Sequence, residues 1–206
     1  VKMSKHKGNV VDPWSVLDKQ GSDAVRWYFY TSSAPWLPSR FYPEAVSEAQ
    51  RKYMGTLWNT YAFFCLYADI DNYDPSKFDL KKCKLSLMDK WILSKLNTLV
   101  DTVDKSLDVY NITDSARALQ DFSDILSNWY VRRGRDRYWG SEMTEDKAAA
   151  YTVLWHVLVT FAKLTAPYTP FIAEEMYLNL VPAFFKDAPK SVHLCSFPVC
   201  DTALVD

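Results

Sequence analysis

The feature that most constrains the fold is a set of four long stretches in which apolar residues recur with the period of an α-helix. The first, from Pro43 to Asp69, carries Met54, Leu57, Trp58, Tyr61, Phe64 and Ala68. The later stripes are Ile92, Leu96, Leu99, Val103 and Leu107; Leu119, Phe122, Leu126, Trp129 and Tyr130; and Ala150, Leu154, Val157, Leu158 and Phe161. A spacing of three to four residues places each stripe on one helix face, which must be buried against another helix. The chain is therefore expected to be mainly α, with an antiparallel helical bundle as its main body.

Capping residues indicate where the helices begin. Asp12 before Pro13 predicts a short helix that stops at Gly21, and Ser22 is expected to cap the next one. The caps expected further on are Ser86 with Asp89 as a capping box, Thr144, and Thr169 before Pro170, whose helix runs to about Leu180.

Prolines and turn residues divide the chain into three parts. Pro35, Pro38 and Pro43 punctuate a linker that ends a first unit of loop and short helices, residues 1–42. The bundle is expected over residues 43–181, and residues 182–206 are expected to form a C-terminal linker with one short extended piece at 191–194.

Composition excludes several classes of protein. A hydrophobic content of 49% supplies a packed core, and a formal net charge of −1 means that any nucleic-acid contact must come from a local patch. The four cysteines form no CxxC pair, so we expect free thiols and no metal site; Cys195 and Cys200 alone make only half a ligand set. The apolar stretches are too short to cross a bilayer and no signal peptide is evident, so a soluble, cytoplasmic protein without membrane contact is expected.

One candidate nucleic-acid site is the segment Asn128–Trp139, which interleaves four arginines with four aromatic residues. Guanidinium groups bind phosphates and flat rings stack on unpaired bases, which are the two needs of single-stranded RNA recognition. The alternative is a surface helix whose arginines extend to solvent while its aromatic rings pack in the core. The segment by itself leaves both open.

A second candidate is the lysine-rich loop 2–9, which precedes the first predicted helix. Lysines on a mobile loop can stabilise the charge that develops when an α-phosphate is attacked. From spacing alone a solvated lysine run is the better interpretation, and the GxxxxGK[ST] pattern of a P-loop is absent.

The order of these segments resembles class I aminoacyl-tRNA synthetases. Lys2-Met3-Ser4-Lys5-His6 is similar to their KMSKS signature, with His6 where Ser is usual. Residues 21–28 resemble the helix that follows this loop in the isoleucine, leucine and valine branch. The segments 51–59, 127–139, 166–171 and 191–194 resemble the isoleucine-specific enzymes, so the resemblance extends over essentially the whole chain.

The resemblance implies roles for individual residues. Lys2 and Lys5 would be catalytic, with Lys5 contacting ATP and Ser4 shaping the ATP loop. ATP would be a substrate, with Mg²⁺ in the parent enzyme, and this fragment would hold no cofactor. The bundle would bind the anticodon stem-loop of tRNA(Ile), with candidate contacts at Trp129, Arg132, Arg133, Arg135, Arg137 and Trp139. Isoleucine and ATP would be bound through a catalytic domain that these residues lack, so the fragment alone is not expected to catalyse aminoacylation.

Helical spacing refines the RNA candidates. Arg133 and Arg137 continue the apolar stripe, and Asp136 is placed to pair with Arg132 or Arg133. We expect about two of the arginines to reach RNA, at least one to be structural, and Trp129 to be buried.

Three alternatives stay open at the level of sequence. The chain could be a helical RNA-binding module without ATP chemistry, a helical protein-interaction module whose arginine segment binds an acidic partner, or the corresponding piece of a valyl or leucyl enzyme. The loop 2–8 is expected to be mobile.

Overall fold

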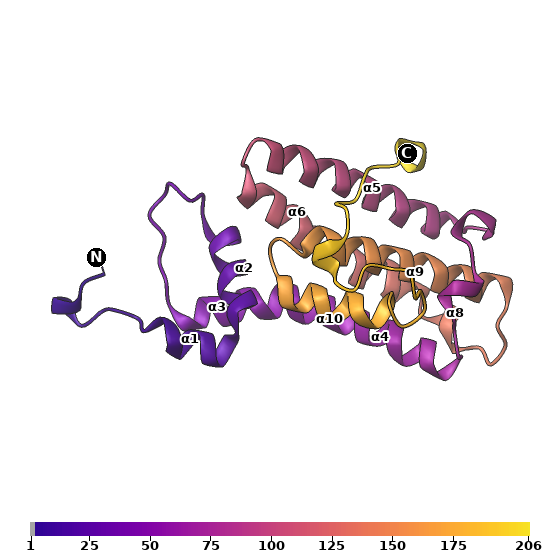
Figure 1. Cartoon of the computed structure of the whole chain (residues 1–206), viewed down its shortest axis with the longest axis horizontal. Coiled ribbons are helices and arrows are strands. Elements are labelled where there is room, and N and C mark those ends of the chain that lie inside the picture. The colour runs from indigo at the N-terminus through magenta and orange to yellow at the C-terminus, as the bar shows by residue number, and fades with distance from the viewer. Residues whose placement is uncertain (1–2) are drawn as a thin grey trace.

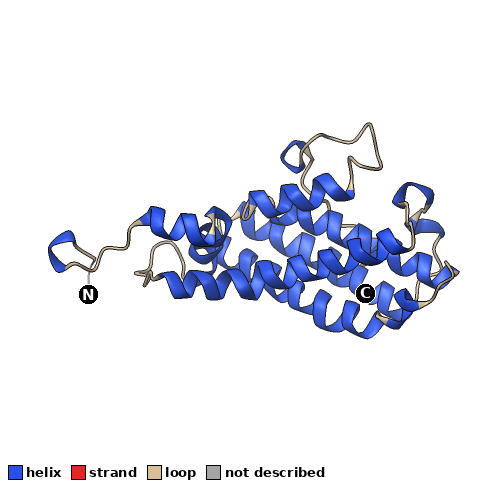
Figure 2. Ribbon diagram, turned by 90° about the horizontal axis from the view of Figure 1, so that it is seen from below, coloured by secondary structure: helices blue, strands red, loops and turns tan. Residues whose placement is uncertain are grey.

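The structure, a computed structural model, describes residues 3–206, with only the backbone of Lys5, and within these residues it contains helices, turns and loops but no strand. The expectation of a mainly α chain built on a helical bundle is confirmed (Figure 2).

The N-terminal helices form a small unit with its own core. This unit comprises a 3-10 turn η1 (Lys5–Lys7) and the helices α1 (Pro13–Gln20), α2 (Ser22–Ser32) and α3 (Pro43–Gln50). Asp12 caps α1 as expected, accepting hydrogen bonds from the backbone of Trp14 and Ser15. The expected Ser22 cap of α2 is wrong: Gly21 occupies the N-cap position and no side-chain cap bond is made. The core of this unit consists of Val16, Ala24, Tyr28 and Val46.

The main helices of the bundle are α4 (Thr56–Ile70), α5 (Leu87–Asp108), α6 (Ile112–Ile125), α9 (Glu145–Thr165) and α10 (Pro170–Leu180) (Figure 1). Ser86 and Asp89 make the expected capping box, and Thr144 accepts the hydrogen bond expected of an N-cap from Lys147. Thr169 makes no such bond. Instead the Asp23 carboxylate, from α2, accepts hydrogen bonds from the backbone of Phe171 and Ile172.

Helix α9 is the central element of the core. By length and composition alone it could cross a membrane, but 78% of its apolar window is buried against the other helices. Its apolar character is therefore explained by packing inside the bundle.

Two π-helical turns interrupt the helices, and each of them packs against both α4 and α6. One, η2 (Arg51–Gly55), joins α3 to α4, and the other, η5 (Leu126–Val131), follows α6. The chain then continues through α7 (Arg132–Gly134) and α8 (Asp136–Trp139). Short 3-10 turns, η3 (Pro75–Lys77) and η4 (Leu80–Lys82), link α4 to α5.

Residues 182–206 lie along the bundle. The backbone N–H of Asp201 donates to Asn97 Oδ1 at 2.8 Å and that of Asp206 to Ser94 Oγ at 3.0 Å, both on α5. The expected extended piece at 191–194 is wrong, because Val192–Leu194 forms a 3-10 turn, η6, in which Val192 is buried. A second such turn is η7 (Thr202–Leu204).

Candidate nucleic-acid interface

The π turn η5 sets which side chains of the arginine-rich segment face solvent. Its buried residues are Leu126, Tyr130 and Val131, and Tyr138 is the next buried side chain. A π turn holds one more residue than an α turn, so the buried stripe advances by five positions from Leu126 to Val131. Trp129 is consequently 52% exposed, and the expectation that it is buried is wrong.

Three of the four arginines lie on the surface. Arg132, Arg133 and Arg135 are exposed, and none of them makes an ion pair within the part of the chain that the structure describes. The Arg133 guanidinium lies 4.9 Å from the ring centroid of Trp129. An aromatic ring and a free cation at this distance form a surface suited to phosphate and base contacts.

Trp139, at the end of α8, is 61% exposed. Its indole N–H donates to the hydroxyl of Tyr67 at 3.1 Å, which fixes the ring against α4. The two exposed tryptophans of the segment therefore stand on either side of its arginines along the chain.

Arg137 differs from the other three arginines. Its guanidinium donates to both carboxylate oxygens of Asp89, at 2.8 and 2.9 Å, and to both of Asp146, also at 2.8 and 2.9 Å. Only 17% of its side chain is exposed. The structure thus gives Arg137 a structural contact, as was expected of at least one arginine. The expected pairing of Asp136 with Arg132 or Arg133 is not found between these described residues.

Asp89 is the hub of this contact. It is fully buried on α5 and also accepts a hydrogen bond from the Tyr130 hydroxyl at 2.6 Å. Burial by itself would raise the pKa of the Asp89 carboxyl, but hydrogen bonds from Arg137, Tyr130 and Ser86 outweigh it and hold this pKa below its ordinary value. The ionised carboxylate therefore ties the arginine segment to the start of α5.

Beside the exposed arginines lies a polar groove of about 350 Å³ between α4 and η5. Its lining consists of Asn59, Thr60, Phe63, Ser127, Asn128, Val131, Arg132 and Arg135. The Arg135 guanidinium lies 5.8 Å from the centroid of Phe63, so the two helices meet through a cation–π contact. Sequence reasoning missed the α4 wall of this groove because Asn59 and Phe63 carry no local signal of binding.

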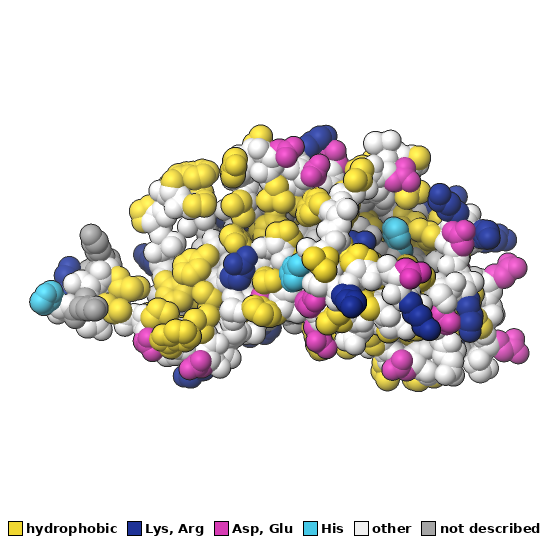
Figure 3. Space-filling view, viewed as in Figure 1, with side chains coloured by type: hydrophobic (Ala, Val, Ile, Leu, Met, Phe, Trp, Pro, Cys, Tyr) yellow, Lys and Arg dark blue, Asp and Glu magenta, His cyan; other side chains and the backbone are white. Residues whose placement is uncertain are grey.

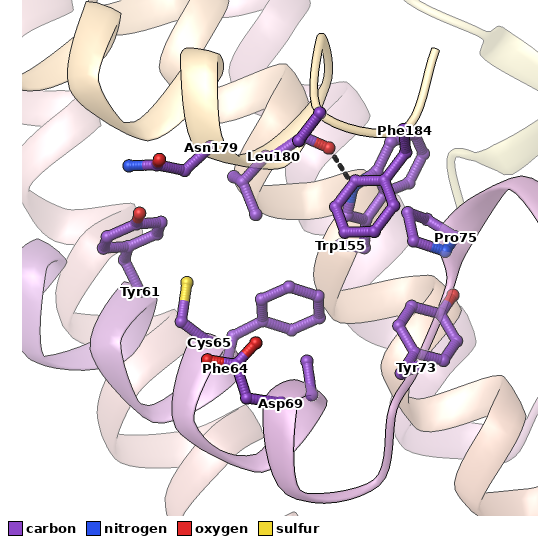
Figure 4. Close-up of a pocket in the computed structure, with 12 residues that line it drawn as sticks. Tyr61, Phe64, Cys65, Asp69, Tyr73, Pro75, Trp155, Asn179, Leu180 and Phe184 are labelled. Carbon is purple, nitrogen blue, oxygen red and sulfur yellow. Dashed lines mark hydrogen bonds between the residues drawn. The ribbon is translucent and has the colours of Figure 1, made fainter.

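A second pocket, of about 460 Å³, has a different chemical character. It lies among α4, α9 and α10 and is lined mainly by aromatic and apolar side chains, with Cys65 beside Tyr61 and no Lys or Arg in the lining (Figure 4). The Trp155 indole N–H across it is already bonded to the Leu180 carbonyl at 2.9 Å (Figure 4). Without a cation, this pocket is unsuited to a polyanion.

The lysine loop lies at the opposite end of the molecule from the arginine segment (Figure 1). The backbone of Lys7 donates to the Ser4 carbonyl at 3.0 Å, and the backbone of Ser4 donates to Asn9 Oδ1 at 2.8 Å, which closes the loop into a compact turn. Lys2 lies outside the described residues, and of Lys5 only the backbone is described. The mobility of this loop stays a prediction.

Large apolar side chains are exposed near this end, including Trp14, Phe29 and Trp36. On the face in Figure 3, apolar side chains gather over the N-terminal helices while Lys and Arg lie mainly over the rest of the molecule. The four cysteines are free, and no group of three or more potential metal ligands is found among the described residues.

Comparison with known families identifies the class of protein. Residues 89–206 match the family model described as the anticodon-binding domain of tRNA ligase, and residues 1–36 match that of class I tRNA synthetases (I, L, M and V). The chain belongs to the anticodon-binding domain family of tRNA ligases, and the resemblance to class I synthetases is confirmed.

Curated relatives that resemble the chain over its whole length are isoleucine–tRNA ligases. The chain is 55% identical over 206 residues to the isoleucine–tRNA ligase of Clostridium novyi, with all of the chain and 20% of the relative covered. It is 46% identical over 206 residues to that of Bacteroides fragilis, covering all of the chain and 18% of the relative. The chain thus spans about a fifth of the length of the curated relatives it matches.

Two solved structures share the fold at low sequence identity. One is the ternary complex of Agrobacterium radiobacter K84 agnB2 LeuRS-tRNA-LeuAMS, with a TM-score of 0.74 at 22% identity, covering 100% of this chain and 23% of that one. The other is Mycobacterium tuberculosis methionyl-tRNA synthetase in complex with methionyl-adenylate, with a TM-score of 0.69 at 19% identity, covering 96% and 41%.

Proposed function

We propose that this chain is part of an isoleucine–tRNA ligase and that its bundle binds the anticodon arm of tRNA(Ile). The observation that carries the proposal is the set of three exposed arginines, Arg132, Arg133 and Arg135, without carboxylate partners among the described residues. Along the chain they lie between Trp129 and Trp139, whose rings are exposed, and the chain is a member of the anticodon-binding family. Arg137 is held by two carboxylates, and we propose that it fixes the position of the segment that carries the three exposed arginines.

The relatives and the match over residues 1–36 support the activity proposed for the parent enzyme. The isoleucine carboxylate attacks the α-phosphate of ATP, with Mg²⁺ as the companion ion, to give isoleucyl-adenylate and pyrophosphate. A ribose hydroxyl at the end of the tRNA then attacks the acyl carbon of the adenylate and loses its proton, which forms the ester, breaks the acyl–phosphate bond and releases AMP. Lys2 and Lys5 are proposed to stabilise the charge that develops on the phosphates, with Ser4 shaping their loop. Such an enzyme works in the cytoplasm.

A protein-interaction module is the alternative from another class, and a folded RNA separates the two. Binding of a labelled anticodon stem-loop of tRNA(Ile) by fluorescence anisotropy should weaken steeply as salt rises, because arginines on phosphates release counterions. Replacing Arg133 by Ala should weaken binding and reduce the salt slope by about one. Arg40→Ala, an exposed arginine near the other end of the chain, is the matched control and should change neither.

The RNA proposal is overturned if Arg133→Ala, Arg132→Ala and the double variant all bind the stem-loop as tightly as the unaltered chain does. An acidic peptide that binds more tightly than the stem-loop would instead favour the protein-interaction module.

The ATP role has a separate test. Isoleucine-dependent ATP–pyrophosphate exchange should be absent in the isolated chain, because the residues that bind the amino acid lie outside it. In the complete enzyme Lys5→Ala should lower this exchange by at least about a hundredfold, since it removes a cation from the developing phosphate charge. Unchanged exchange in that variant would leave the lysine loop without a role in adenylate formation.

A further inference from the structure

The polar groove between α4 and η5 has the composition of a nucleobase site. We propose that it receives one unstacked base of the bound RNA loop, whose edge is read by the side-chain amides of Asn59 and Asn128. This inference rests on the proposed function and adds to it a specificity site whose first wall, on α4, lies outside the arginine segment.

The two amides are free to bind a ligand. Asn59 and Asn128 are exposed, and neither side chain makes a hydrogen bond within the described part of the chain. Each amide offers one oxygen that accepts and one NH₂ group that donates, which is the pattern needed to pair with the edge of a base. Because the amides come from two different helices, a base between them could be held from two sides.

The remaining lining supplies stacking and charge. The flat Arg135 guanidinium, placed against Phe63, offers a face on which a base can stack. Arg132 lines the same groove with an exposed cation that makes no ion pair among the residues the structure describes, and it is suited to the phosphate of that nucleotide. The groove is also lined by the buried side chains of Thr60 and Val131. The Thr60 hydroxyl already donates to the Thr56 carbonyl at 3.0 Å, so its proton is not available to a base.

The apolar pocket of Figure 4 shows why an asparagine alone is not enough. The side-chain amide of Asn179, labelled in Figure 4, already donates to the Glu175 carbonyl at 3.0 Å and to Glu175 Oε1 at 3.2 Å. That pocket also has no cation in its lining. Asn179→Ala is thus a matched control for the two groove variants, because it removes the same amide from an exposed helix position.

The test is a cycle between protein variants and abasic RNA. Anticodon stem-loops carrying a single abasic nucleotide at each loop position in turn are titrated against the unaltered chain, Asn59→Ala, Asn128→Ala and Asn179→Ala. In the unaltered chain we expect one abasic position to weaken binding about tenfold or more, because stacking and edge contacts are both lost. Asn59→Ala and Asn128→Ala should each weaken binding of the intact loop severalfold. In these variants the abasic nucleotide at that position should weaken binding much less than it does in the unaltered chain.

The salt dependence separates this inference from the proposed function. Removing an uncharged amide should leave the salt slope of binding unchanged, whereas Arg133→Ala lowers it. If each abasic position weakens RNA binding by the same factor in both groove variants as in the unaltered chain, the groove is not a base site. Salt-dependent binding of the stem-loop would in that case still support the RNA interface. If the unaltered chain does not bind the stem-loop at all, the proposed function is wrong and the base site with it.

Discussion

At the scale of single residues, the arginine segment divides into exposed cations and one buried anchor. Arg137 and Asp89 are joined by two parallel hydrogen bonds, at 2.8 and 2.9 Å, in the planar geometry that a guanidinium and a carboxylate favour. Tyr130, at the π turn, donates to the same carboxylate. One buried Asp on α5 therefore fixes both ends of the segment that carries Arg132, Arg133 and Arg135.

Replacing Asp89 by Asn should destabilise the fold by about 3 kcal/mol near neutral pH, because the partly buried Arg137 guanidinium loses the buried one of its two carboxylate partners and keeps only the more exposed Asp146. The pKa of Asp89 is lowered in the folded state, so its contribution is complete above the pKa of an unfolded Asp and is lost as pH falls through the folded-state pKa. Urea unfolding at several pH values should thus show the difference between the two proteins shrinking below about pH 4.

Asp104→Asn, an exposed Asp on the same helix, is the control for that measurement. Two outcomes would show that the ion pair does not provide the stability. In one, Asp104→Asn loses as much unfolding free energy as Asp89→Asn does. In the other, the difference in unfolding free energy between Asp89→Asn and the unaltered chain stays constant down to pH 2.

At the scale of elements, two backbone features set how the helices follow one another. The π turn η5 moves the buried stripe by one position and thereby exposes Trp129. At the junction of α1 and α2, Gly21 has φ +82° and ψ 160°, a region that is almost exclusively occupied by glycine. Chain direction at this junction therefore depends on the absence of a side chain.

Gly21→Ala should lower the free energy of unfolding by about 1 to 3 kcal/mol, because alanine is strained at this φ. A Cβ at Gly21 meets nothing within 4 Å, so the effect comes from the backbone alone. Gly140→Ala is the control: its Cβ also meets nothing, but its φ of −64° suits alanine, so stability should be unchanged or slightly higher. Thermal unfolding of both variants checks this, and equal midpoints would contradict it.

At the scale of the whole molecule, the N-terminal unit and the bundle are fixed to each other at α2. Arg26 donates to the carbonyls of Tyr168, at 3.0 Å, and Pro167, at 2.8 Å. Trp27 stacks on Tyr53 with ring centroids 3.6 Å apart, and Asp23 caps α10 from a distance. These contacts set the separation between the lysine loop and the arginine segment, which the proposed enzyme would use at opposite ends of one tRNA.

Asp23→Ala should loosen this attachment. The amides of Phe171 and Ile172 lose their acceptor, at a cost of about 1 kcal/mol for a helix cap, so their hydrogen exchange should become faster. Asp12→Ala removes a cap that is local to α1 and should leave exchange at residues 171–172 unchanged. Faster exchange at these amides in both variants would indicate a general loss of stability rather than a loosened contact.

Local sequence information was sufficient for most elements. The 3.6-residue stripes placed the bundle helices, and the capping residues Asp12, Ser86 and Thr144 act at the positions expected of them. The KMSKS-like motif and the order of the later segments predicted the class I tRNA synthetase family, which the family comparisons confirm. These signals are local because propensity, capping and periodicity act over a few residues.

Tertiary structure decided what the arginine segment presents to solvent. Arg132, Arg133, Arg135 and Arg137 are chemically alike in the sequence, but only Arg137 meets Asp89 and Asp146, which come from other helices. The exposure of Trp129 follows from a π turn that no local pattern announces, and the groove with Asn59 exists only because α4 packs against η5. The sequence by itself determined the helices and the family. Packing between distant segments determined which of the described arginines have no carboxylate partner. The reason is that an ion pair or a groove requires a second segment that the local sequence does not contain.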